Sequence, residues 1–187
     1  MPFMKNSKTL ELTYTALFAA LIVICSWISI PATVSFTLQT FAVFLAAGLL
    51  GGKRATLSVI IYVLLGAVGL PVFTGFKGGM GALLGTTGGY IIGFIFTALV
   101  MWLFEYVLKE RFNKPLFLAL SMAVGLIVCY AFGTAWFINV YTRTKGPVGI
   151  LAALSWCVFP FIIPDVLKIA LALSLTLKLK KYIPFGK

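Results

Sequence analysis

The chain has 187 residues, of which 61% are hydrophobic and only 10% are charged. Soluble globular proteins carry about 25% charged residues, so this composition excludes an ordinary soluble domain and indicates a polytopic membrane protein. The net charge of +11 would suggest nucleic acid in a soluble protein. Here most basic residues cluster at span ends, so we attribute the charge to membrane topology and expect no nucleic-acid partner.

Six apolar runs predict an all-α protein with six transmembrane helices in a single membrane domain covering residues 1–187. The N-terminal run lacks a convincing cleavage site and more spans follow it, so it reads as an uncleaved first helix. The spans are predicted at about residues 8–29, 37–50, 55–70, 87–108, 115–141 and 164–179.

A glycine-rich stretch, residues 69–94, lies between the third and fourth spans. It holds nine of the 18 glycines and a single lysine, Lys77. Glycine permits positive φ and close approach of the backbone. Irregular backbone at membrane depth is tolerated only where it is buried in protein or lines a cavity. We predict a non-helical binding loop, and an ordinary flexible loop is the alternative.

Two features mark the end of the chain. A loop over residues 142–147 is predicted after the fifth span. The apolar run 148–181 that follows is too long for one straight span. Pro160 and Pro164 each lack a backbone donor, so we expect a short helix or re-entrant piece and then a break at these prolines.

The basic residues are distributed unequally between the two predicted sides. Only Lys77, Arg143 and Lys145 fall on one side. Eleven fall on the other, which carries both termini: Lys5, Lys8, Lys53, Arg54, Lys109, Arg111, Lys114, Lys178, Lys180, Lys181 and Lys187. The positive-inside rule then predicts cytoplasmic N- and C-termini and an outward-facing glycine-rich loop.

Asp165 and Lys168 lie inside the predicted sixth span. Residues at i and i+3 share a helix face, so the two can pair. Pro164 at a first helical position would place Asp165 in the first turn, where the helix dipole favours a carboxylate. Ionisable groups within a span cost about 2.5–3.5 kcal/mol each on insertion scales and are usually functional. The pair predicts part of a binding site, and a self-neutralising structural pair is the alternative.

Aromatic residues occur near the same predicted level of the membrane. Aromatic side chains at span ends are more often interface anchors than ligand contacts. Tyr90 and Trp136 are the stronger binding candidates, because Tyr90 adjoins the glycine-rich stretch and Trp136 lies near Asn139.

Groups that usually support catalysis are scarce. The chain has no histidine, the commonest general base and metal ligand. Cys25, Cys129 and Cys157 lie inside apolar runs at no metal-ligand spacing, and their odd number argues against a disulfide framework. With Asp165 as the acid deep in a span, acid–base and metal chemistry lack their usual residues. We therefore predict neither an enzyme nor a bound cofactor or metal.

Several motifs, in this order, resemble the BioY family of biotin-binding S components of energy-coupling factor (ECF) transporters. They are Thr37-Leu38-Gln39-Thr40-Phe41, residues 66–71, Gly85-Thr86-Thr87-Gly88-Gly89-Tyr90, Gly133-Thr134-Ala135-Trp136-Phe137, Pro160-Phe161 and Pro164-Asp165 with Lys168. Two positions depart from the family pattern, which usually has proline at Thr86 and often at Ser35.

The resemblance implies a six-helix fold that captures biotin on its outward face. It also implies assembly in a prokaryotic cytoplasmic membrane with a transmembrane coupling subunit and two ATPase subunits. Ala16 and Ala20, a small-xxx-small pair, look like the family's surface for docking the coupling subunit. The expected substrate-binding residues are Asp165, Lys168, Tyr90, Thr87, Gly78, Gly79, Gln39, Trp136, Asn139 and Phe73.

The chemistry of these residues suits biotin. A buried carboxylate such as Asp165 can accept hydrogen bonds from the ureido N–H groups, and an amide or ammonium can donate to the ureido carbonyl. Either glycine backbone N–H groups or Lys77 can meet the valerate carboxylate. A solitary transporter that needs no ATPase and an S component for another vitamin are the alternative functions.

Overall fold

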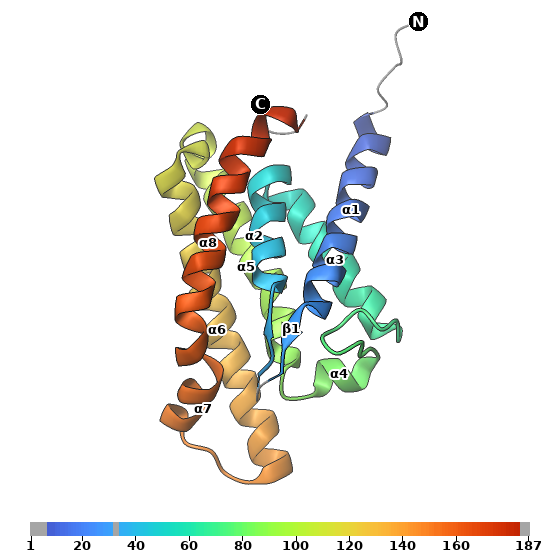
Figure 1. The fold of residues 1–187 in the computed structure, drawn as a ribbon, viewed down its shortest axis with the longest axis vertical. Helices are drawn as coiled ribbons and strands as arrows, with labels where there is room; N and C mark the ends of the chain where they lie inside the picture. Colours follow the sequence, from blue (N-terminus) through green and yellow to red (C-terminus); the bar gives the residue numbers. More distant parts are fainter. Residues whose placement is uncertain (1–6, 32–33, 184–187) are drawn as a thin grey trace, which may run out of the picture.

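The computed structural model describes residues 7–31 and 34–183, and Lys5 and Lys187 of the charge pattern lie outside these residues. The described chain is a helix bundle with one small β-ladder (Figure 1). Its elements are α1 (Ser7–Trp27), β1 (Ser29–Ile30), β2 (Phe36–Thr37), α2 (Gln39–Leu50), α3 (Gly52–Ala67), α4 (Met80–Leu84), α5 (Gly88–Leu108), η1 (Lys109–Asn113), α6 (Pro115–Lys145), α7 (Ile150–Cys157), α8 (Phe159–Leu179) and η2 (Lys180–Tyr182).

Among the described residues, four helical segments are long and apolar enough to cross a membrane. They are Lys8–Trp27, Gly88–Asn113, Pro115–Lys145 and Phe159–Tyr182. The helices at the predicted second and third spans are shorter, with 12 residues in α2 and 16 in α3, whereas a span needs about 20. Helix length therefore supports four of the six predicted spans directly.

Helix α2 forms the centre of the bundle. It packs against α1, α3, α5 and α8, and most of its residues are buried. A helix that is apolar all round is stable only when neighbours cover it on every side. Gly51, with φ +83°, ends α2, and the N–H of Gly52 donates to a carboxylate oxygen of Glu105 at 2.6 Å. This contact fixes the turn into α3 against α5.

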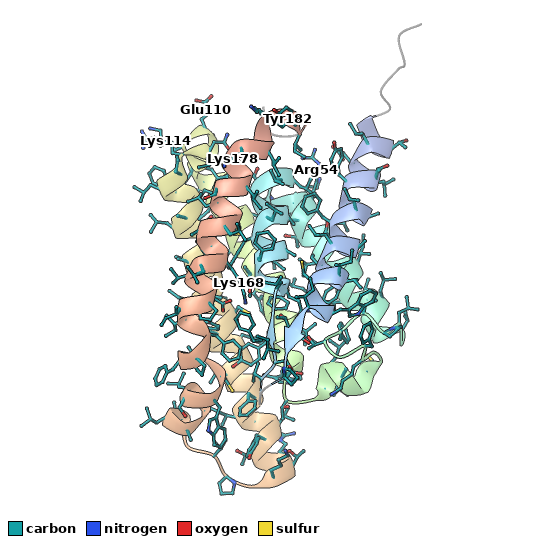
Figure 2. All side chains as sticks on the ribbon, in the orientation of Figure 1. Arg54, Glu110, Lys114, Lys168, Lys178 and Tyr182 are labelled. Atoms are coloured by element: carbon teal, nitrogen blue, oxygen red, sulfur yellow. The ribbon has the colours of Figure 1, made fainter. Side chains whose placement is uncertain are left out.

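The bundle has two distinct ends (Figure 1). Helix α1 begins and helix α8 ends at the same end of the bundle, which we call the terminal end. Helix α4 and the connection between α6 and α7 lie at the opposite end, which we call the loop end. Figure 2 shows Arg54, Lys114 and Lys178 at the terminal end, and Lys168 between the two ends. The positions of these labelled cations agree with the charge asymmetry in the sequence.

The glycine-rich stretch is partly helical, so the prediction of a wholly non-helical segment is wrong. After an irregular loop, Gly79 with φ +87° begins the one-turn helix α4, and α5 begins at Gly88. Gly79 takes a left-handed conformation that favours glycine, while the residues of α4 itself are compatible with a helix. Glycine content alone did not separate a turn from a short helix.

The α6 helix is longer than expected and continues to Lys145, so most of the predicted loop 142–147 is helical. Arg143 and Lys145 lie in its last turn, where cations interact favourably with the helix dipole. Gly146, with φ +111°, ends the helix.

The break in the last apolar run lies at Val158 and not at the prolines. Pro160 occupies the first turn of α8, where a missing N–H leaves no intrahelical bond unmade. Pro164 lies inside α8, so Asp165 is not in the first helical turn as predicted. A second unpredicted feature is the antiparallel ladder that pairs Ser29 with Thr37 and Ile30 with Phe36.

Candidate functional site

A cavity of about 630 Å³ lies towards the loop end of the bundle. Residues from α2, the glycine-rich stretch, α5, α6, α7 and α8 line it. Seven of the ten predicted binding residues are on its wall: Gln39, Phe73, Gly78, Thr87, Tyr90, Asp165 and Lys168. The tertiary structure thus brings together side chains that are spread over most of the sequence.

Asp165 is the buried anion of this cavity. It is 2% exposed, and its two carboxylate oxygens accept hydrogen bonds from three side chains. Oδ1 accepts from Lys168 Nζ at 2.7 Å and from Thr40 Oγ1 at 3.1 Å. Oδ2 accepts from the hydroxyl of Tyr130 on α6. A carboxylate oxygen accepts about two hydrogen bonds, so Oδ2 has one acceptor position left.

Lys168 is nearly as buried as Asp165, with 6% exposure. Besides Asp165, its ammonium donates to Thr40 Oγ1 at 3.1 Å and lies 4.1 Å from the centre of the Phe36 ring. A cation over an aromatic face is attracted by the ring quadrupole. The Asp165–Lys168 pair is therefore electrically neutral as a unit, and both charges have partners.

Gln39 on α2 is held by polar neighbours. Its carbonyl oxygen accepts from Thr37 Oγ1 at 3.0 Å and from Thr74 Oγ1 at 3.4 Å, and its amide nitrogen donates to the hydroxyl of Tyr62. An amide nitrogen has two N–H donors, so one remains available. Gln39 therefore offers a donor close to the wall that carries Asp165.

Phe73 and Tyr90 supply aromatic surface. The Phe73 ring fills the space above Gly66 on α3, where an added Cβ would lie 1.9 Å from its Cζ. The Tyr90 ring packs over Gly133 in the same manner, and its hydroxyl is 2.9 Å from Thr134 Oγ1. The glycines of these helices allow both rings to pack tightly against the backbone.

Three predicted binding residues do not line the cavity. The indole N–H of Trp136 donates to the carbonyl of Gly85 at 3.0 Å, which holds the turn before α5. Gly79 donates its N–H to the carbonyl of Gly66 at 2.7 Å. Asn139 is exposed on α6. Trp136 and Gly79 thus support the wall of the cavity, whereas Asn139 is not part of its lining.

Sequence reasoning missed several residues of the site, above all Tyr130 and Thr40. Both lie on the cavity wall and bind Asp165. Thr40 belongs to a quoted motif, but Tyr130 lies 35 positions before Asp165 and in no motif that was recognised. A tyrosine inside an apolar helix, away from the membrane interfaces, is the signal that was available for Tyr130.

Fold and site together define an α-helical membrane protein with a polar cavity inside one end of its bundle. Residues 3–185 match the BioY family, and the chain belongs to this family. The resemblance seen in the motifs is therefore confirmed.

The relatives and one solved structure give the family its context. The biotin transporter BioY of Thermotoga maritima is 44% identical to this chain over 172 residues, which cover 91% of this chain and 96% of that protein. The probable biotin transporter BioY of Pyrococcus horikoshii is 38% identical over 174 residues, which cover 92% of this chain and 98% of that protein. A crystal structure of the S-component for biotin from an ECF-type ABC transporter has a TM-score of 0.84 and 30% identity, covering 96% of this chain and 95% of that one. These relatives are named for transport and not for catalysis, which confirms the prediction that the chain is not an enzyme.

Proposed function

We propose that this chain is the biotin-binding S component of an ECF-type transporter. The observation that carries the proposal is the buried Asp165 carboxylate, held on a cavity wall with one acceptor position left, in a chain of the BioY family. Similar relatives are named as biotin transporters, and a similar structure is an S component for biotin.

The cavity suggests how biotin is bound. The ureido ring lies against Asp165 and Gln39, because one N–H can donate to Oδ2 and the ureido carbonyl can accept from the amide of Gln39. Phe73 and Tyr90 contact the apolar thiophane ring. Thr87 and Gly78 bound the cavity on the side of the glycine-rich stretch. Lys168 holds Asp165 in place, and Trp136 and Gly79 hold the wall.

The proposed orientation in the membrane has six crossings with both termini in the cytoplasm. The shorter helices α2 and α3 complete the count, because their neighbours in the bundle bury much of their surface. The loop end, with few cations, then faces outward in a prokaryotic cytoplasmic membrane, in agreement with the positive-inside rule. The cavity then lies towards the outward end, the side from which biotin arrives.

The proposed partners are a transmembrane coupling subunit and two ATPase subunits. Ala16 and Ala20 are both exposed on α1, where small residues allow another helix to approach closely. We propose this face as the docking surface for the coupling subunit.

Binding by the purified protein tests the proposed ligand. Mass spectrometry of the protein as isolated is expected to detect co-purified biotin. Calorimetry against a panel of vitamins is expected to show tight binding of biotin alone, because a site of buried polar groups rejects ligands that leave those groups unpaired. Tight binding of a different vitamin, or of none, would contradict the proposal.

A further inference from the structure

The inner part of the cavity is electrically balanced. Asp165 and Lys168 form an ion pair of 2.7 Å, and Thr40 and Tyr130 supply further hydrogen bonds to the carboxylate. The two opposite charges cancel, so the pair has no net charge with which to attract a charged group of a ligand. Removing either charge from such a buried pair would be costly. The group that binds beside Asp165 is therefore a neutral polar group with an N–H donor, and an anionic group of the same ligand must find its cation elsewhere.

Lys77 is the other cation on the cavity wall. It lies at the end of a tight turn, where its carbonyl accepts from the N–H of Phe73 at 2.9 Å. Its side chain is exposed, and within the described part of the chain its ammonium has no hydrogen bond or ion pair. Gly75 and Phe76, with φ +71° and +57°, shape the turn that directs Lys77 to the cavity.

The turn is attached firmly to α1. Trp27 stacks on Phe76 with ring centres 5.0 Å apart, and its indole N–H donates to the carbonyl of Pro71 at 3.0 Å. Ser26 Oγ donates to the carbonyl of Val72 at 2.6 Å. These contacts fix the backbone that carries Lys77, so less order has to be imposed on it when a ligand binds.

Within residues 7–31 and 34–183, no acidic side chain pairs with the cations of the loop end. The chain has four acidic residues, all in the described ranges, and Asp165 is the only one of these four on the cavity wall. Glu11 pairs with Arg54 at 2.6 Å, Glu105 binds the N–H of Gly52, and Glu110 lies at the terminal end (Figure 2). The loop end keeps Lys77, Arg143 and Lys145, and an opening lined by one sign of charge attracts ligands of the opposite sign.

We infer that Lys77 binds the carboxylate of the ligand at the mouth of the cavity, while Asp165 binds the neutral head. This inference rests on the proposed function and deepens it, because biotin combines a neutral ureido ring with a carboxylate. Lys77 thus determines the preference for the free acid over ligands with an uncharged tail.

The test compares biotin with biotinamide, whose tail is uncharged, on three variants. Lys77→Gln is expected to weaken biotin binding about tenfold and biotinamide binding by less than about twofold, as for the loss of one hydrogen bond to a charged group. Lys77→Arg is expected to keep the preference for the acid, because it keeps the charge. Arg143→Gln is the matched control, since it removes one cation from the same end but not from the cavity wall.

The outcomes separate this inference from the function on which it rests. The inference is overturned if Lys77→Gln weakens the binding of biotin and biotinamide equally, or weakens the binding of neither. It is also overturned if Arg143→Gln reduces the preference for biotin over biotinamide as much as Lys77→Gln does. Unchanged binding of biotinamide by Lys77→Gln shows that this variant is folded. If the unmodified protein binds neither biotin nor biotinamide, the proposed function is wrong, and the inference that rests on it is wrong as well.

Discussion

At the scale of single residues, the site depends on how Asp165 is paired. A carboxylate in a membrane protein is costly to bury, yet here it accepts hydrogen bonds from Lys168, Thr40 and Tyr130. The three donors come from three different helices, α8, α2 and α6. Asp165 therefore joins the elements around the cavity, and its Oδ2 keeps one acceptor position.

Replacing Asp165 with Asn is expected to abolish high-affinity biotin binding. The amide has no negative charge, so Lys168 becomes a buried cation without a counter-ion, which costs about 3–5 kcal/mol in comparable pairs. Calorimetry would measure the affinity and thermal unfolding would measure stability.

The double variant Asp165→Asn with Lys168→Met is the matched control for this change. It removes both charges, so we expect it to recover stability but not binding. Binding of biotin at normal affinity by the single variant would contradict the assignment of Asp165 to the ligand site.

At the scale of elements, the glycine-rich stretch and α3 are built to fit each other. Phe73 is 2% exposed and lies against Gly66, with Tyr62 edge-on to its ring at 5.5 Å between centres. Its ring also forms part of the cavity wall. One glycine on a helix thus sets the position of an aromatic ring on the cavity wall.

The variant Gly66→Ala tests this packing. Helix propensity alone predicts that alanine stabilises α3 by about 1 kcal/mol. The added Cβ would meet the Phe73 ring, so we expect the opposite sign, a loss of about 1–3 kcal/mol from overpacking, together with weaker biotin binding. Chemical denaturation and calorimetry measure the two effects.

Gly149→Ala is a suitable control for this prediction, because nothing lies within 4 Å of its added Cβ. We expect both its stability and its affinity to stay close to those of the unmodified protein. A stabilised Gly66→Ala variant with normal affinity would show that Phe73 does not occupy the space above Gly66.

At the scale of the whole molecule, the cavity and the proposed docking face are separate. The cavity lies towards the loop end, whereas Ala16 and Ala20 are exposed along α1. The C-terminal end of α1 contacts the glycine-rich stretch through Trp27, so one helix connects the two regions. The architecture would allow the proposed partner to dock on α1 without entering the cavity.

Substituting both Ala16 and Ala20 with Leu is expected to block assembly with the coupling subunit and stop ATP-driven uptake. Biotin binding is expected to be unchanged, because neither residue lines the cavity. Small residues at a helix interface allow close approach, and leucine side chains prevent it. Co-purification with the coupling subunit, uptake of labelled biotin and calorimetry provide the three measurements.

The chain offers a matched control in Ala131 and Ala135, an exposed pair with the same spacing on α6. Leucine at both positions is expected to leave assembly and uptake intact. Uptake by cells that lack every coupling and ATPase subunit would instead favour a transporter that works alone.

Several features of this protein follow from the sequence alone. Composition and apolar run length determine the membrane class and the approximate bounds of α1, α5 and α6, because they depend on residues that are neighbours in the chain. The pairing of Asp165 with Lys168 is also local, since residues three positions apart share a helix face. The family motifs contain ten of the 23 residues that line the cavity, Gln39, Tyr90 and Asp165 among them.

Only the tertiary structure decided the rest. Tyr130 and Thr40, 35 and 125 positions from Asp165, became its partners because α6 and α2 pack beside α8. The helix break fell at Val158 because Pro160 fits a first helical turn, where its missing N–H is not needed. The partners of Asp165 are not visible in any local pattern, because they depend on which side chains the folded bundle brings within hydrogen-bonding distance. The position of the break is local, but the sequence left it open because a proline can either break a helix or begin one.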